Sequence, residues 1–177
     1  LSWPPVCVDA IRTLTDRKGI TIKGPGVITG FDDGVVVGGA NLKVLGVTFR
    51  DLADEAINVG PSPGSLIVGN VFRNVGSAID FSAGNGKVLV KGNVVAHARV
   101  GIFVAGAVGA AIVDNLVADV SGSVGIFVEG PNAVVKGNRV ARAADVGILL
   151  SDVTNGKVVA NTVTGAGTSG IDLDETQ

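Results

Sequence analysis

The chain has 177 residues, of which 46% are hydrophobic and 17% charged, with 27 Gly, one Cys and no Met or Tyr. This apolar content and a net charge of -2 exclude a disordered chain, and the glycines lack the every-third-residue spacing of collagen. Since 14 Lys and Arg face 16 Asp and Glu, and no apolar run nears the roughly 18 residues of a bilayer span, we expect no nucleic-acid partner and no membrane insertion.

The first predicted element is a short helix near the N-terminus. Apolar residues at Val6, Ala10, Ile11 and Leu14 follow helical spacing. An amphipathic helix there would cover the open end of the repeats that begin at residue 20. We therefore expect residues 1–19 to form an N-terminal cap.

Residues 20–173 carry an internal repeat. A small residue, an aliphatic residue, any residue and another apolar residue recur seven times at intervals of 22–24 positions. Because these apolar residues are mostly β-branched and alternate with outward positions, they predict short strands rather than helices. The aliphatic second positions are Val35, Ile57, Ile79, Ile102, Ile126, Ile148 and Ile171.

An asparagine series runs in phase with this repeat. Its members are Asn70, Asn93, Asn115, Asn138 and Asn161, at intervals of 22 or 23. An antiparallel sandwich does not require one residue type at one phase, but a parallel solenoid does, because equivalent positions lie about 4.8 Å apart. The prediction is an all-β parallel solenoid of about seven coils with three short strands per coil, in which the stacked asparagines are structural.

The Gly-Ile-x-Val units and the Gly-Asn turns at Gly69-Asn70, Gly92-Asn93 and Gly137-Asn138 resemble those of right-handed parallel β-helix repeat proteins, the pectate-lyase-like superfamily. The resemblance covers about residues 20–173 and implies a right-handed solenoid. Many members of that superfamily bind, cleave or epimerise acidic polysaccharides, whereas others are phage tailspikes or surface proteins. The resemblance is specific for the fold and leaves the chemistry open.

The far end of the repeats has no predicted cap. After the last coil only the tail 174–177 follows, so the terminal core would be exposed. We expect this coil to be covered by more chain, by another subunit or by the acidic tail. The whole chain, 1–177, is predicted to be a single β-helix domain.

One outward line of residues is chemically varied. Four positions after the ladder asparagines lie Asn74, His97, Asp119, Arg142 and Gly165, and Asp51 is the equivalent position in the coil before them. The polar members of this line are candidate substrate-binding residues, and His97 is the candidate general base. Arg73 or Arg99 would neutralise a sugar carboxylate. The alternative is a solvated face whose charges alternate between coils.

A second outward line contains Phe103 and Phe127, which we expect to contact a sugar ring or another chain unless a turn covers them.

The pair Asp32-Asp33 is superficially similar to the Asp-Asp pair of polygalacturonases. The other motifs of those enzymes are absent, so a turn before Val35 is the favoured interpretation. One His and one Cys far apart predict no zinc site, and no cofactor or metal is expected.

Two functions remain open from the sequence. The first is an extracellular, cell-surface or periplasmic protein that binds or processes an acidic polysaccharide. If it is an enzyme, a lyase or epimerase is favoured over a hydrolase, because no carboxylate pair lies on the varied line. The second is a structural module that self-associates, and a fragment of a longer β-helix enzyme is a further alternative.

Overall fold

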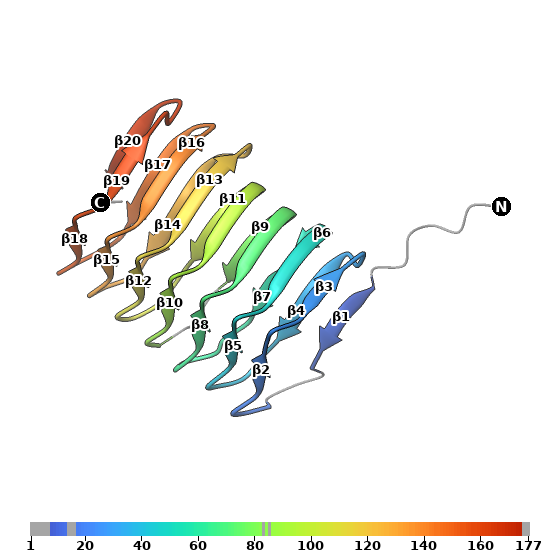
Figure 1. The fold of residues 1–177 in the computed structure, drawn as a ribbon. Coiled ribbons are helices and arrows are strands. Elements are labelled where there is room, and N and C mark those ends of the chain that lie inside the picture. Colours follow the sequence, from blue (N-terminus) through green and yellow to red (C-terminus); the bar gives the residue numbers. More distant parts are fainter. Residues whose placement is uncertain (1–7, 14–16, 83, 85, 175–177) are drawn as a thin grey trace.

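The computed structural model describes residues 8–13, 17–82, 84 and 86–174. They form a parallel β-solenoid of seven coils, each of which passes through three sides (Figure 1). Every strand pairs in parallel with its equivalents in the neighbouring coils, as the sequence repeat predicts. The described residues include no helix, and therefore none long and apolar enough to cross a membrane.

One side of the solenoid is a separate seven-stranded sheet. Each of its strands has three residues, with the middle side chain pointing inward and the outer two pointing to solvent. The strands are β2 (Thr21–Lys23), β5 (Lys43–Leu45), β8 (Leu66–Val68), β10 (Leu89–Lys91), β12 (Ala111–Val113), β15 (Val134–Lys136) and β18 (Lys157–Val159).

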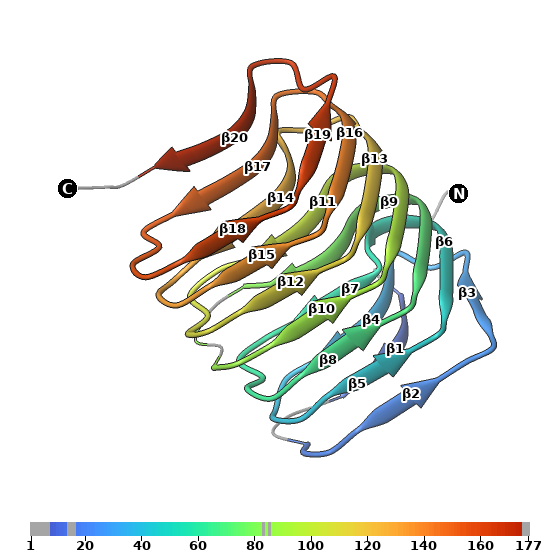
Figure 2. The ribbon, with the colours of Figure 1, turned by 60° about the vertical axis from the view of Figure 1, so that its left-hand side comes forward.

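The other two sides belong to one thirteen-stranded sheet that bends around a corner (Figure 2). It stays continuous because β9 (Val71–Phe81) and β11 (Val94–Val104) run through the corner without a break. Before the corner lie β3 (Val27–Thr29), β13 (Leu116–Val120), β16 (Arg139–Ala143) and β19 (Thr162–Thr164). Strand β6 (Thr48–Glu55) begins before the corner and continues past it to Glu55. After it lie β1 (Asp9–Arg12), β4 (Asp33–Val37), β7 (Ile57–Val59), β14 (Val124–Glu129), β17 (Val146–Ser151) and β20 (Ser169–Asp174).

Stacked rows of identical or similar side chains fill the interior. Ile57, Ile79, Ile102, Ile126 and Ile148 are fully buried and in register, and each contributes about 1.5–3 kcal/mol through burial. Phe49 and Phe72 stack in neighbouring coils, with ring centroids 5.1 Å apart. The repeat therefore fixes the inward rows through packing and leaves the outward rows free to vary.

The asparagine series forms a continuous hydrogen-bonded ladder at one corner. Asn70 donates from its backbone N and from Nδ2 to Oδ1 of Asn93, at 2.9 and 3.0 Å, and its Nδ2 also donates to the Val44 carbonyl. Asn93, Asn115 and Asn138 repeat the pattern toward Asn161. Because these side chains satisfy buried backbone groups, their role is structural.

The predicted N-terminal helix is wrong where the structure describes the segment. Asp9–Arg12 is strand β1, which pairs in parallel with β4 and places Ile11 beside Val35. A strand satisfies the edge backbone groups of the first coil, which a helix would leave unpaired. Residues 1–7 and 14–16 of the predicted cap lie outside the described residues.

The last described coil leaves apolar side chains exposed. Ile171 is 45% exposed and Leu173 is 67% exposed, although their equivalents in the preceding coil, Ile148 and Leu150, are buried. Leu150 and Leu173 line a hollow at this end of the solenoid. What covers this coil stays a prediction.

Candidate functional site

The varied line of residues lies at the corner of the thirteen-stranded sheet, where each coil turns on one residue in a left-handed conformation. The φ angles are 53° at Asp51 and Asn74, and 56° at His97, Asp119 and Arg142. Asn, Asp and His tolerate this region better than most residues do. The demands of the backbone therefore explain much of the residue choice along this line, which we call the corner line.

Neighbouring side chains on the corner line bind one another. Nδ2 of Asn74 donates to Oδ1 of Asp51 at 3.0 Å, and Nη2 of Arg142 donates to Oδ2 of Asp119 at 2.9 Å. The hydrogen bond from Arg142 holds the pKa of Asp119 below its usual value, and that of Arg142 is raised for the same reason. Nδ1 of His97 lies 4.0 Å from Asp119, beside a shallow, open hollow. The charge of Arg142 is thus already balanced within the chain.

The two arginines assigned to catalysis lie on either side of the corner. Arg73 is in register with Ala96 on the side before it, and Arg99 forms an ion pair with Asp54 at 3.4 Å on the side after it. Within the described chain, neither makes a hydrogen bond or an ion pair with His97. The assignment of His97, Arg73 and Arg99 as catalytic residues stays a prediction.

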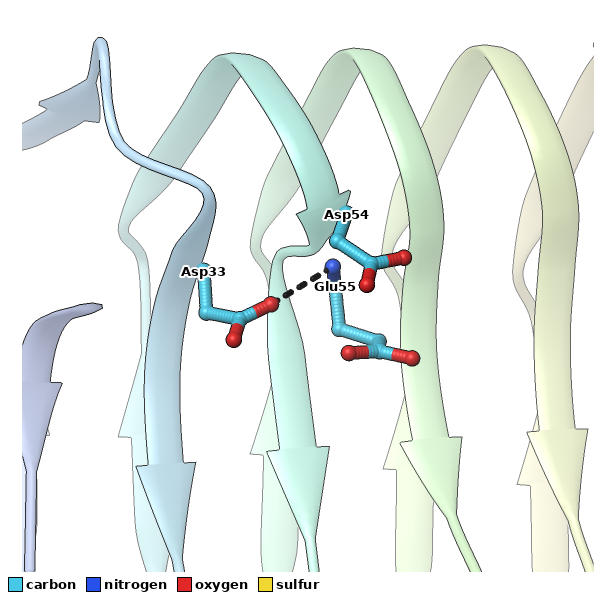
Figure 3. A group of neighbouring side chains, drawn as sticks. All are labelled: Asp33, Asp54 and Glu55. Carbon is cyan, nitrogen blue, oxygen red and sulfur yellow. Dashed lines mark hydrogen bonds between the residues drawn. The ribbon is translucent and has the colours of Figure 1, made fainter. Parts of the chain in front are cut away.

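The side after the corner carries a cluster of carboxylates (Figure 3). Oxygens of Asp33, Asp54 and Glu55 lie within 4.8 Å of one another. Each has a donor: Asp33 accepts the Glu55 backbone N–H at 2.9 Å, Glu55 accepts Asn58 at 3.4 Å, and Asp54 pairs with Arg99. Carboxylate oxygens suit hard cations such as Ca²⁺. Here, however, donors of the chain itself already bind an oxygen of each carboxylate.

Burial raises the pKa of Asp33, of Glu55 and of nearby Asp80, and the charge of Asp54 adds to the effect on each. In the described part of the chain, Oδ1 of Asp80 is buried and accepts no hydrogen bond. The ionised form of these carboxylates is therefore unfavourable, and a positive charge placed beside them would stabilise it.

The line that contains the two phenylalanines forms one continuous ladder on the same side. Its members are Val36, Asn58, Asp80, Phe103, Phe127, Leu149 and Asp172, each in register with the next. The rings of Phe103 and Phe127 stack with centroids 4.5 Å apart and planes within 11° of parallel. Since the ring faces contact each other, the rings offer mainly their edges to a partner. We call this side of the solenoid, from β1 to β20, the acidic face.

The seven-stranded sheet has the opposite character. Its seven strands, all described, contain no acidic residue and carry five exposed lysines among aliphatic side chains. The lysines are Lys23, Lys43, Lys91, Lys136 and Lys157. The aliphatic residues between them include Leu66, Val68, Leu89, Val113 and Val134, all half-buried on the outer surface. We call this side the lysine face.

Neither charged face was predicted from the sequence, although both follow from the repeat. Asp33 and Glu55 are 22 positions apart, which is one repeat, so they had to be neighbours. Comparing the outward positions of the strands of the seven-stranded sheet from coil to coil would have brought the lysines together in the same way. The balanced composition does not indicate either face, because charges of opposite sign lie on different sides of the solenoid. The expectation of no nucleic-acid partner stays a prediction.

The fold and ladders define a right-handed parallel β-helix of seven coils. A family model described as "Right handed beta helix region" matches residues 33–177, and the chain belongs to that family. A solved structure of the Streptococcus pneumoniae surface protein and adhesin PfbA matches with a TM-score of 0.63 and 12% identity, over 90% of this chain and 49% of that one. The chain thus spans about half the length of that structure, and the likeness shows the fold. No curated protein sequence matches.

Proposed function

We propose that this β-helix is a binding module that holds an acidic polysaccharide along its lysine face. The observation that carries the proposal is the set of five exposed lysines on seven strands without an acidic residue. Neighbouring coils are about 4.8 Å apart, so this face is a flat track about 30 Å long. A rigid track of this kind suits an extended, negatively charged chain.

The aliphatic residues between the lysines support a sugar chain over other polyanions. Leu66, Leu89 and Val113 offer apolar surface that can contact the C–H groups of sugar rings, while the lysines pair with carboxylates or sulfates. In its described strands the lysine face has neither arginine nor aromatic side chains, on which nucleic-acid bases would stack.

The proposal concerns binding rather than turnover. On the corner line Arg142 is committed to Asp119, and the hollow beside His97 is shallow and open. A lyase or epimerase reaction would need a site that holds the sugar carboxylate against an arginine beside the base, which a shallow, open hollow does not favour. A place outside the cell or on its surface is part of the proposal, supported by the fold shared with a surface adhesin.

Isothermal titration calorimetry with polygalacturonate tests the proposal. The double variant Lys91→Gln/Lys136→Gln should bind about fivefold to thirtyfold more weakly, because each lysine contributes up to about 1 kcal/mol. The matched control is Arg50→Gln/Arg73→Gln, which removes the same charge from exposed positions on the side before the corner. It should bind as the unaltered protein does.

Two results would overturn the proposal. One is an equal loss of affinity in the lysine and arginine variants, which would indicate an effect of total charge. The other is tighter binding of double-stranded DNA than of polygalacturonate at the same ionic strength, which would indicate a general or nucleic-acid polyanion site.

A further inference from the structure

The outward residues of the acidic face follow a simple order along the solenoid axis. The coils of β4, β7 and β9 carry Asp33, Glu55 and Asp80. The next three coils carry the apolar side chains Phe103, Phe127 and Leu149 beside the single carboxylate of Glu129. The last described coil carries Asp172 and Asp174. The order is acidic, mainly apolar, acidic.

The lysine face has the matching order with the opposite charge. Its first strands carry Lys23 and Lys43, and the last two carry Lys136 and Lys157. Between them, β8, β10 and β12 present mainly Leu and Val around the single Lys91. Both faces consist of the same coils, so their charges recur with the same spacing of about 4.8 Å.

We propose that the acidic face binds the lysine face of a second copy of this chain. In this contact Lys136 and Lys157, or Lys23 and Lys43, lie against the carboxylates, and the Phe103–Phe127 pair packs on the aliphatic centre. Asp80 gains a cation beside an oxygen that has no hydrogen bond within the described chain. Charge complementarity thus selects the occupant of the acidic face.

The contact differs from a two-fold dimer. Because it joins two different faces, each copy keeps one unused acidic face and one unused lysine face, and the association is open-ended. A face about 30 Å long and about 10–17 Å wide, set by the coil spacing and by strands of a few residues, offers roughly 300–500 Å². A standard stable interface buries about 800 Å² per partner. The association should therefore be reversible, concentration-dependent and weakened by salt.

Sedimentation velocity over a range of protein concentrations tests the inference with two variants. Lys91→Gln/Lys136→Gln alters only the lysine face, and Asp80→Asn/Asp172→Asn alters only the acidic face. The unaltered protein should show a sedimentation coefficient that rises with concentration at low ionic strength and stays at the monomer value in high salt. Each variant alone should remain largely monomeric.

The decisive sample is an equimolar mixture of the two variants. Each contributes one intact face, so the mixture should form one-to-one dimers and nothing larger. A mixture that stays monomeric while the unaltered protein associates would overturn the contact between unlike faces. So would a monomeric unaltered protein at low salt, or variants that associate as it does. Circular dichroism of each variant confirms that loss of association is not loss of fold, and no polysaccharide is needed at any step.

Discussion

The lysine face and the acidic face are built from the same seven coils, yet they carry opposite charges. Inward rows repeat closely because each side chain must pack on its equivalent in the next coil. Outward rows have no such constraint, so each side can acquire its own charge and its own partner. A net charge of -2 therefore describes neither face. In a solenoid, the charge of each side has to be counted separately before a class of binding partner is excluded.

The largest effect should come from breaking the ladder on which both faces depend. Asn115→Ala removes the acceptor of Asn93 N and Nδ2 and the donor to the Val90 carbonyl, all buried. Unsatisfied buried groups cost about 1–3 kcal/mol each, so we expect a loss of about 2–4 kcal/mol in the free energy of unfolding.

Urea unfolding followed by circular dichroism measures this loss. The matched control is Asn58→Ala on the acidic face, where the side chain makes one long bond to Glu55 at 3.4 Å. It should cost less than about 1 kcal/mol. Equal losses in the two variants would contradict the distinction between constrained inward rows and free outward rows.

A carboxylate placed on each face compares the two directly. Val113 lies in register between Lys91 and Lys136, so Val113→Glu would neutralise the centre of the lysine face. We expect polygalacturonate affinity to fall about tenfold, which corresponds to about 1.4 kcal/mol. Val36→Glu adds the same charge to the acidic face and should leave affinity unchanged by calorimetry. A weaker complex in both variants would show that the position of the charge does not matter.

The acidic face should also make stability depend on pH. Burial raises the folded-state pKa of Asp33, Glu55 and Asp80 above the unfolded values. Between the unfolded and the raised folded pKa values, the folded chain binds more protons than the unfolded chain. The free energy of unfolding is therefore greater at pH values below this range, and it falls as pH rises through the raised pKa values.

Asp80→Asn tests this dependence, because it removes one of the three groups. Its effect is reduced by solvent screening, and we expect a stabilisation of less than about 1 kcal/mol at neutral pH. In urea titrations, the difference in free energy of unfolding between the variant and the unaltered protein should disappear at pH values below the unfolded pKa. A variant that is less stable at neutral pH would contradict the assignment of Asp80 as a carboxylate that is costly to ionise.

The smallest effect is expected on the corner line. His97→Ala and Arg142→Gln change side chains whose partner, Asp119, lies within the chain. Polygalacturonate affinity should stay the same in both variants when measured by calorimetry. Substantially weaker binding by either variant would move the polysaccharide from the lysine face to the corner line.

The sequence was sufficient for the coils and insufficient for the surfaces. Ile57, Ile79 and Ile102 revealed the period because packing forces the same residue type to recur. The strand at Asp9–Arg12 could not be distinguished from a helix, since its pairing with β4 involves backbone rather than side-chain pattern. The left-handed backbone conformation at His97 could not be read from the sequence. The presence of histidine there therefore suggested catalysis, although the backbone conformation also favours this residue type.

The most direct test of the lysine face is chemical footprinting of its amines. Acetylation followed by mass spectrometry would compare lysine reactivity with and without polygalacturonate, using exposed Lys18 as the reference outside the seven strands. The account predicts strong protection of Lys91 and Lys136, protection of Lys23, Lys43 and Lys157, and unchanged reactivity of Lys18. Uniform protection of all lysines, or none on the seven strands under conditions where the polysaccharide binds, would contradict it.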